Sequence, residues 1–315
     1  MKRFLVLSLI TIIVGIPLFS QMMKYPNLKK TNYIKNSTLI VATIEGSHKK
    51  LKEYQNKPNR LEMYNKYIDA YNANLVEAVK SAWNFTDSSK IIAMPLKDAK
   101  KLARKGDYAI LNVGSTNSWS LPSSYGNWDV TYITYGRHME ILIPGKSIKI
   151  FLPQFNGFLT KDIAIYGVNQ IQYFLRKSEE IGGFGYADWI RKGVKPNYKK
   201  IKDVTLLVPE EWCILSEEEI KELYRYDFEM MPYDSIRKKI LNKEKGYASV
   251  MIVPVPFGDH YDYFQYYYNI ESGMVYNIIY DTFNIGLKGG PYTGDRMAYL
   301  IKTSFKKIQE DIEEE

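Results

Sequence analysis

One stretch of this sequence occurs twice, and it constrains the fold more than any other feature. Each copy has a short apolar segment ending in Met-Pro, then a basic amphipathic segment, then Tyr-Ala at the start of an apolar run. The first copy covers residues 90–113 and the second covers residues 228–253. Met-Pro recurs at an offset of 137 residues and Tyr-Ala at an offset of 139. Both copies therefore predict the order strand, helix, strand.

The segments around the two copies also follow one order. Residues 38–44 and 204–208 are continuously apolar and β-branched, which predicts buried strands. Thr-x-Asp at 160–162 and at 293–295 predicts the starts of two closing helices. We therefore predict an α/β (α+β) fold. It is a tandem duplication of a strand–helix–strand–helix–hairpin–helix unit, with mixed sheets and helices packed on one face. The alternative is coincidence, because the matching motifs are short.

The predicted boundaries follow changes in composition. The chain has 315 residues, longer than one typical domain. Residues 38–180 are predicted to form the first α/β unit and residues 204–315 the second. The glycine-rich, basic residues 181–203 would connect them, and the polar residues 21–37 would form a flexible lead. Residues 1–20 are predicted to form a signal peptide.

Periodicity predicts the remaining elements. Apolar residues at three- and four-residue steps predict a long helix over residues 58–83 and a short one over 96–105. Alternating residues predict two antiparallel strand pairs, each joined by a short turn. The first pair covers residues 128–135 and 139–143 around a turn at 136–138, and the second covers 261–268 and 274–282 around 271–273.

The amino terminus has the pattern of a signal peptide. Lys2 and Arg3 precede an apolar run over residues 4–19, and Ser20 is a small residue at a plausible cleavage point. The alternative is an uncleaved anchor, for which sixteen residues are short. No later segment is apolar enough to span a membrane. We therefore predict a periplasmic or secreted protein with no transmembrane segment after signal removal.

Charge and cysteine content restrict the partners. The formal charge is +8, but the lysines are scattered, so no nucleic-acid partner is predicted. A mild basic balance could favour an anionic envelope surface, although solvated lysines explain it more simply. Cys213 is the only cysteine, which excludes an intramolecular disulfide and a cysteine-based metal site. Its apolar neighbours predict a buried structural thiol.

The sequence predicts no catalytic, metal or cofactor site. It contains no Gly-x-Ser-x-Gly elbow and no His-Glu-x-x-His motif. His48, His138 and His260 each lie alone in a predicted loop or turn, where solvated histidines are common. An enzyme is therefore the less favoured reading.

Tyrosine is the most unusual part of the composition, with 27 residues. Exposed tyrosine rows suit glycan or protein partners, because they offer rigid area and a hydroxyl. The alternative, which we favour, is that tyrosine simply fills a sheet. Asp259 and His260 could add polar groups, although a polar loop before an edge strand explains them more simply. The candidate binding residues are Tyr261, Tyr263, Tyr266, Tyr268, Trp128, Tyr132, Asp259 and His260.

Two functional hypotheses follow. The first is a non-enzymatic binding or scaffold protein of the bacterial envelope, whose partner is an envelope protein or a glycan. The second is an envelope hydrolase acting on glycans or peptides, with carboxylates at the hairpin loops. Its candidate acids are Asp129, Glu140, Asp259 and Asp262.

Two resemblances support the first hypothesis. The phrase over residues 64–79, followed by Trp83-Asn84-Phe85, resembles exported proteins of Bacteroidota, which implies export but no activity. More loosely, the element order and Gly106-Asp107-Tyr108-Ala109 resemble the α/β unit of curli-secretion lipoproteins and of the amino-terminal domain of TolB. That resemblance implies envelope assembly and protein contacts. The chain lacks the lipid-bearing cysteine of the curli proteins, and no functional residue carries over.

Overall fold

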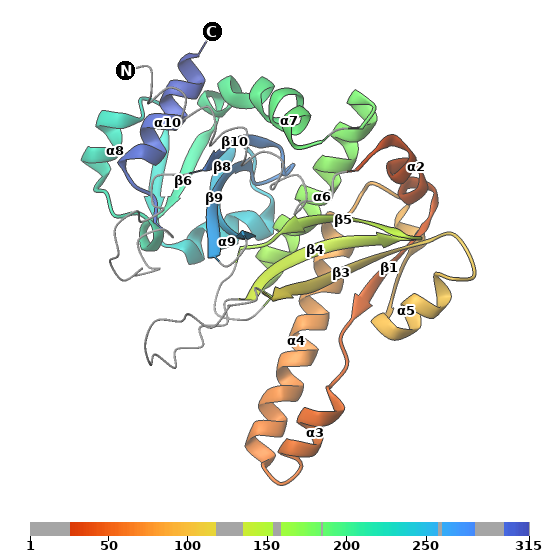
Figure 1. Cartoon of the computed structure of the whole chain (residues 1–315). Helices are drawn as coiled ribbons and strands as arrows, with labels where there is room; N and C mark the ends of the chain where they lie inside the picture. Colours follow the sequence, from red (N-terminus) through yellow and green to blue (C-terminus); the bar gives the residue numbers. More distant parts are fainter. Residues whose placement is uncertain are drawn as a thin grey trace, which may run out of the picture. The chain divides into compact units, whose positions relative to one another are not determined.

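The computed structural model describes residues 26–117, 135–153, 159–183, 185–257, 260–280 and 299–314. These residues form two compact units (Figure 1). The first unit contains the described residues of 25–114 and 137–183, and the second those of 184–315 together with 115–117 and 135–136, the adjoining ends of β3 and β4. The second unit thus includes most of the predicted connector.

The first unit is built around a five-stranded sheet in the order β2-β1-β3-β4-β5. Strand β1 lies between β2 and β3 and is parallel to both, whereas β4 and β5 are antiparallel to each other. In chain order its elements are α2 (Leu28–Asn36), β1 (Thr38–Thr43), α3 (His48–Tyr54), α4 (Pro58–Ala82), the 3-10 helix η1 (Ser88–Lys90), β2 (Ile91–Pro95), α5 (Leu96–Leu102), β3 (Tyr108–Asn117), β4 (Tyr135–Ile143), β5 (Lys146–Phe151) and α6 (Lys161–Ile181).

The second unit has a sheet in the order β7-β6-β8-β9-β10, with β6 parallel to β7 and β8 and the last three strands antiparallel. Its elements are α7 (Tyr186–Asp188), the π-helix η2 (Trp189–Val194), the 3-10 helix η3 (Lys195–Asp203), β6 (Thr205–Pro209), η4 (Glu210–Trp212), α8 (Glu217–Leu223), β7 (Phe228–Met231), α9 (Tyr233–Asn242), β8 (Tyr247–Phe257), β9 (His260–Asn269), β10 (Val275–Tyr280) and α10 (Lys302–Glu313).

The two sheets share their strand order, and β1 pairs with β2 and β3 as β6 pairs with β7 and β8, in parallel and in the same register. Thr38 lies opposite Tyr108 in the first sheet, and Thr205 lies opposite Tyr247 in the second. The amide of Thr38 donates to the carbonyl of the residue before Tyr108 at 3.1 Å, and that of Thr205 to the residue before Tyr247 at 3.0 Å. The mixed α/β architecture is therefore confirmed. Tandem duplication as its origin stays a prediction.

The repeated Met-Pro motif has the same local structure in both units. Pro95 and Pro232 have the same backbone angles, φ −55° and ψ 140°, and a helix begins at the next residue in each case. Proline lacks an amide hydrogen, and the first amides of a helix have no partner within the helix, so proline there loses no hydrogen bond. Met-Pro thus ends a strand and starts a helix.

Helices lie on both faces of each sheet, so the prediction of helices on one face is wrong. In β4, Leu142 packs with Ala99 and Leu102 of α5, whereas Met139 lies against Gly167 of α6. Residues three apart in a strand point to opposite faces. In β8, Val250 packs with α8 and α10, whereas the ring of Tyr247 contacts Lys239 of α9. The crossovers from β1 to β2 and from β2 to β3 run in opposite directions along the sheet, as do those from β6 to β7 and from β7 to β8. Right-handed crossovers that run in opposite directions place their helices on opposite faces.

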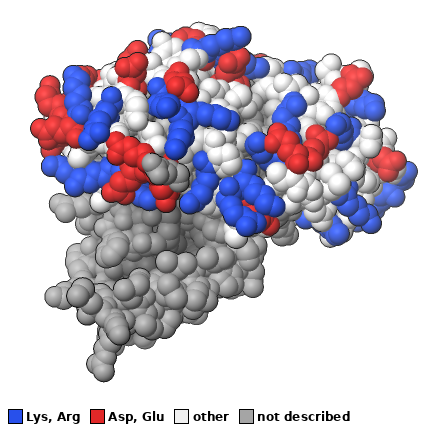
Figure 2. Space-filling model, turned by 90° about the horizontal axis from the view of Figure 1, so that it is seen from above, with Lys and Arg blue, Asp and Glu red and all other residues white. Residues whose placement is uncertain are grey.

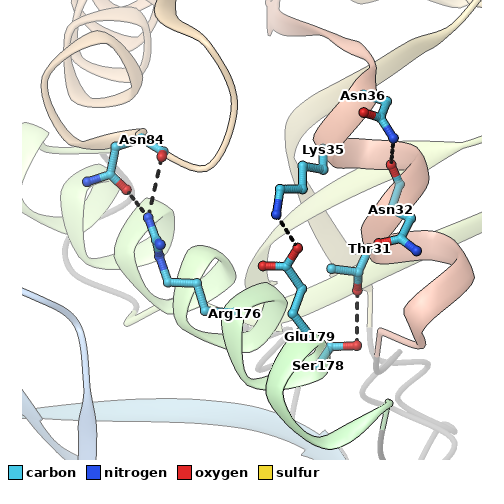
Figure 3. A network of polar contacts seen from close by, with 8 residues as sticks. All are labelled: Thr31, Asn32, Lys35, Asn36, Asn84, Arg176, Ser178 and Glu179. Atoms are coloured by element: carbon cyan, nitrogen blue, oxygen red, sulfur yellow. Dashed lines mark hydrogen bonds and ion pairs between the residues drawn. The ribbon is translucent and has the colours of Figure 1, made fainter.

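The predicted flexible lead is wrong for residues 28–36, which form α2. Asn27 caps this helix by accepting a hydrogen bond from the amide of Lys30 at 3.0 Å. Figure 3 shows how α2 is attached to α6. The buried hydroxyl of Thr31 donates to that of Ser178 at 3.0 Å, and Lys35 forms an ion pair with Glu179 at 2.6 Å.

Figure 3 also shows a second attachment to α6, from the loop after α4. Arg176 donates to the side-chain oxygen of Asn84 at 2.6 Å and to its carbonyl at 3.3 Å. The guanidinium of Arg176 and the ammonium of Lys35 each lie 6.0 Å from the ring centroid of Phe85. Both cations are thus within the distance at which an aromatic ring attracts positive charge, which favours this arrangement.

Three further predictions need correction. Residues 137 and 138 lie within β4 rather than in a turn. The predicted connector, residues 181–203, contains α7, η2 and η3, and its described residues from 185 onward belong to the second unit. The closing helix α10 begins at Lys302, after Leu300 has formed a parallel bridge with Cys213. Residues 293–295, the predicted helix start, lie outside the described residues.

The predicted long helix is confirmed as α4, but only its second half is buried in the unit. Its buried side chains begin at Tyr71, and the 25-residue helix extends well before that point. In Figure 1 the first turns of α4 and all of α3 project beyond the sheet. Among the described helices, none combines the length and the apolarity that crossing a membrane requires.

Candidate functional site

A cluster of polar side chains lies on the first sheet, on the face that also carries α5. It consists of Asn112 on β3, His138 and Glu140 on β4, and Lys149 on β5, and we call it the polar cluster. Asn112 donates to Glu140 at 3.3 Å, and Nε2 of His138 lies 3.8 Å from Oε1 of Glu140. Lys149 lies directly opposite Glu140 in the register of β4 and β5. Asn112 and His138 are 8% and 6% exposed.

Strand periodicity places these side chains on one face. Residues 138 and 140 are two apart in β4, and Leu142, the next in that row, packs in the α5 cluster. Gly114 of β3 makes room for the imidazole. A Cβ at this glycine would lie 2.7 Å from Nε2 of His138, closer than real contacts. The ring also packs edge-on against Phe151, with centroids 6.4 Å apart.

The surroundings of Glu140 keep it ionised. Burial alone would raise the pKa of this carboxyl, but His138, the Asn112 amide and the nearby Lys149 together bring the pKa below its ordinary value. Donors and positive charge stabilise the carboxylate more than partial burial destabilises it. The cluster thus offers a preorganised anionic acceptor, flanked by an imidazole, an amide and an ammonium group.

The second sheet provides an internal comparison for these positions. The side-chain contacts of Asn112 with Glu140 and of Gly114 with His138 indicate that these residues lie opposite each other in the neighbouring strands β3 and β4. The second sheet has the same alignment, with Met251 opposite Tyr266 and Val253 opposite Phe264. Taking Tyr108 as the counterpart of Tyr247, the polar cluster residues Asn112, His138, Glu140 and Lys149 correspond to Met251, Phe264, Tyr266 and Ile278, and Gly114 corresponds to Val253.

The differences between the two sheets at these five positions indicate which residues the fold requires. The second sheet has the same topology with apolar and aromatic side chains at these five positions. The architecture therefore does not require the polar set. Burying polar and ionised groups costs free energy that apolar packing does not. The second sheet lacks both the glycine and the histidine, and in the first sheet a side chain at Gly114 would overlap the imidazole.

The predicted tyrosine row does not form an exposed platform. Tyr266 is 7% exposed and Tyr268 is 1% exposed, while Tyr263 is half-buried. The neighbouring Tyr267, on the opposite face, is also buried, and its hydroxyl donates to Gln265 at 3.0 Å. These tyrosines fill the sheet, in agreement with the packing alternative. Their burial removes the surface on which their binding role depended.

The other candidate residues can be placed only in part. His260 and Tyr261 belong to β9, and His260 pairs with Phe257 across the hairpin. Since β9 lies between β8 and β10, the polar segment does not precede an edge strand. Trp128, Tyr132, Asp129 and Asp259 lie outside the described residues, as do the side chains of His260, Tyr261 and Asp262. Glu140 is thus the one candidate acid whose side chain is described.

The histidine and cysteine predictions had different outcomes. His138 is buried in a strand, so its prediction as a solvated turn residue is wrong, whereas His48 is exposed at the start of α3. Cys213 is partly buried, its thiol lies 3.8 Å from the carbonyl of Leu215, and burial raises its pKa. A raised pKa reduces the thiolate fraction, which agrees with a structural thiol.

Sequence reasoning identified Glu140 only as a distant alternative and missed its partners. One signal was present: His138, Glu140 and Leu142 alternate with Met139, Ile141 and Ile143, the period of a strand with two different faces. In the residues that the structure describes, no three His, Cys, Asp or Glu side chains converge as metal ligands would. Comparisons with protein-family models, with curated proteins and with solved structures found no match. The resemblances to exported and envelope proteins therefore stay predictions.

Proposed function

We propose that this chain is a non-enzymatic binding or scaffold protein of the bacterial envelope. Its partner is contacted by Glu140 and Lys149, the partly exposed members of the polar cluster, while the buried Asn112 and His138 hold Glu140 in place. One observation carries the proposal. At five register-equivalent positions the second sheet has apolar or bulky residues, and the first has Gly114 beneath a buried polar set. Groups that cost stability and that the fold does not need are commonly retained for binding.

The chemistry of the cluster favours binding over hydrolysis. A glycosidase general acid needs a raised pKa, so that it still holds its proton near neutral pH. The pKa of Glu140 is lowered instead, which suits a permanent hydrogen-bond acceptor. An acceptor beside amide, imidazole and ammonium groups complements the hydroxyls and amides of an envelope glycan or peptide.

Export is the second part of the proposal. The basic residues 2–3 and the apolar run 4–19 support a periplasmic or secreted location, with cleavage near Ser20. Fractionation of the producing cells and amino-terminal sequencing of the protein test this. A protein that keeps Met1 and stays in the cytoplasm would refute export and leave the polar cluster untouched.

The binding proposal is tested by giving the first sheet the residues of the second. The exchange variant carries Asn112→Met, Gly114→Val, His138→Phe, Glu140→Tyr and Lys149→Ile. We expect a native circular dichroism spectrum and an unchanged or higher melting temperature, because buried polar groups are replaced by apolar ones. We also expect loss of the chemical-shift changes that soluble peptidoglycan fragments and short envelope peptides produce in the unmodified protein.

A matched control removes one negative and one positive charge elsewhere on the first unit, as the exchange variant does in the polar cluster. Glu45 and Lys97 are both exposed and lie outside the polar cluster, so Glu45→Gln with Lys97→Gln should bind as the unmodified protein does. Binding that survives in the folded exchange variant would exclude the polar cluster. Turnover of these fragments by the unmodified protein, abolished by Glu140→Gln, would favour the hydrolase instead.

A further inference from the structure

We propose that the projecting hairpin, residues 48–68, is a contact surface for anionic phospholipid headgroups. This inference is independent of the polar cluster. The hairpin consists of α3 and the first turns of α4, which extend beyond the sheet in Figure 1. No residue of α3 is buried, and the buried residues of α4 begin only at Tyr71.

The hairpin is ordered by aromatic contacts of its own. The rings of Tyr54 and Tyr64 meet edge to face with centroids 5.8 Å apart, and the hydroxyl of Tyr64 accepts a hydrogen bond from the amide of Ser47 at 2.8 Å. The ammonium of Lys50 lies 5.4 Å from the centroid of the Tyr64 ring. The hairpin therefore presents its outer residues from a defined scaffold.

Positive charge is concentrated in this segment. Its 21 residues contain six lysines or arginines and two glutamates, a net charge of +4, which is half of the formal +8 of the whole chain. The one ion pair within it among the described residues joins Lys66 and Glu62 at 2.6 Å. The remaining cations are exposed: Lys49, Lys50, Lys52, Lys57 and Arg60.

An isolated apolar side chain accompanies these cations. Met63 is 72% exposed, the highest value among the exposed large hydrophobic residues of the described chain. It lies one helical turn from Arg60 and from Lys66, so it is flanked by positive charge. A protein partner would normally meet a patch of several apolar residues. One flexible side chain among cations instead suits a headgroup layer, where cations meet phosphates and the apolar group enters the interface.

The second unit shows that the fold does not need this hairpin. Between β1 and β2 the first unit has 47 residues, which include α3 and α4. Between β6 and β7 the second unit has 18 residues, with η4 and the seven-residue helix α8. The α8 helix begins with three consecutive glutamates, so the corresponding connection is short and acidic there. The greater length and the positive charge of this connection are therefore features of the first unit alone.

Figure 2 provides a contrast for this distribution. On the face that it shows, Lys and Arg side chains are interspersed with Asp and Glu. A mixed surface creates little net field at a distance, because opposite charges cancel within a Debye length of about 8 Å. A cluster of cations without ion-pair partners creates a net positive field, which attracts the hairpin to anionic headgroups.

The test is sedimentation of the full chain with phosphatidylglycerol–phosphatidylcholine vesicles and with phosphatidylcholine vesicles. The quantity compared is the difference between the two, because any contribution of the apolar residues 1–20 is common to all variants. The hairpin variant carries Lys49→Gln, Lys52→Gln, Lys57→Gln and Arg60→Gln. We expect its affinity for the anionic vesicles to fall at least about tenfold, since each surface cation contributes several-fold to binding. Binding of the unmodified protein should also disappear at high salt.

The matched control removes four exposed lysines from the second unit, with Lys199→Gln, Lys202→Gln, Lys238→Gln and Lys306→Gln. This control has the same net charge as the hairpin variant, but it should bind the anionic vesicles as the unmodified protein does. Met63→Ser, which leaves the charge unchanged, should weaken binding several-fold. Equal binding to both vesicles, or equal losses in the hairpin and control variants, would overturn the proposal. The exchange variant of the polar cluster should bind vesicles normally, so the two proposals fail separately.

Discussion

Gly114 and His138 face each other across β3 and β4 so closely that a Cβ on the glycine would lie 2.7 Å from Nε2 of the imidazole. This contact holds a buried histidine beside Glu140, 3.8 Å away. The corresponding positions of the second sheet hold the opposed pair Val253 and Phe264. The absence of a side chain at Gly114 is therefore what makes the polar cluster sterically feasible.

Gly114→Ala tests this contact directly. We expect it to lower the free energy of unfolding by about 1–3 kcal/mol, because the added methyl group overlaps a ring that is enclosed by its neighbours. Urea unfolding followed by circular dichroism measures the loss. In a His138→Ala background the same alanine should cost almost nothing. An equal cost in both backgrounds would show that the imidazole is not the obstacle.

A second prediction concerns the pH dependence of stability. The pKa of Glu140 is lower in the folded protein than its ordinary value of 4.5. Such a group stabilises the fold at pH values above its unfolded pKa, and this contribution is lost as the pH falls through the folded value. The unmodified protein should therefore lose more stability than Glu140→Gln on acidification below about pH 4.5.

The measurement is the urea midpoint of both proteins along a pH series, together with the carboxyl carbon shift of Glu140. That shift should titrate below 4.5 in the unmodified protein and at higher pH in Asn112→Leu, which removes one hydrogen-bond donor. Parallel acid losses in the unmodified protein and in Glu140→Gln would contradict the assignment.

Local sequence patterns predicted the framework of both units well. Continuous apolar runs identified β1 and β6, and Met-Pro identified the corners before α5 and α9, because these depend on residues adjacent in the chain. The face on which each helix packs was wrong, since it depends on the order of strands in the sheet, which no local pattern contains. Nor did any local pattern show that Tyr266 and Tyr268 would be buried.

The polar cluster was missed for a related reason. His138 follows Gly136 and Arg137, a composition typical of turns, yet it belongs to a strand paired with Phe151. Its partners Asn112 and Glu140 lie in two strands whose alignment only the tertiary structure gives. Neither strand contains a motif of its own. Such a site can therefore be recognised only when the register of the two strands is known.

A third prediction concerns the attachment of α2, where two polar contacts differ in burial. Thr31→Val leaves the buried hydroxyl of Ser178 without its donor, which should cost about 1–3 kcal/mol. Lys35→Met removes an ion pair whose lysine side chain is 53% exposed, which should cost no more than about 1 kcal/mol. Amide hydrogen exchange in α2 measures both effects.

The double variant Thr31→Val with Ser178→Ala serves as the control for the buried pair. It removes donor and acceptor together, so the exchange rates of α2 should return toward those of the unmodified protein. Faster exchange in Lys35→Met than in Thr31→Val would show that the exposed ion pair, rather than the buried hydroxyl pair, holds the helix.

The last prediction concerns the end of α9, where Lys243 has a positive φ of 52°. A left-handed conformation is unfavourable for a residue with a Cβ, and glycine is the usual residue at this position after a helix. Lys243→Gly should therefore raise the free energy of unfolding by about 0.5–1 kcal/mol, measured as a higher urea midpoint. Lys245→Gly, in the same turn but without a positive φ, is the matched control. It should have no effect or a small destabilising one, because it adds flexibility to the unfolded chain and relieves no strain. A gain in both variants would point to loss of positive charge rather than to backbone conformation.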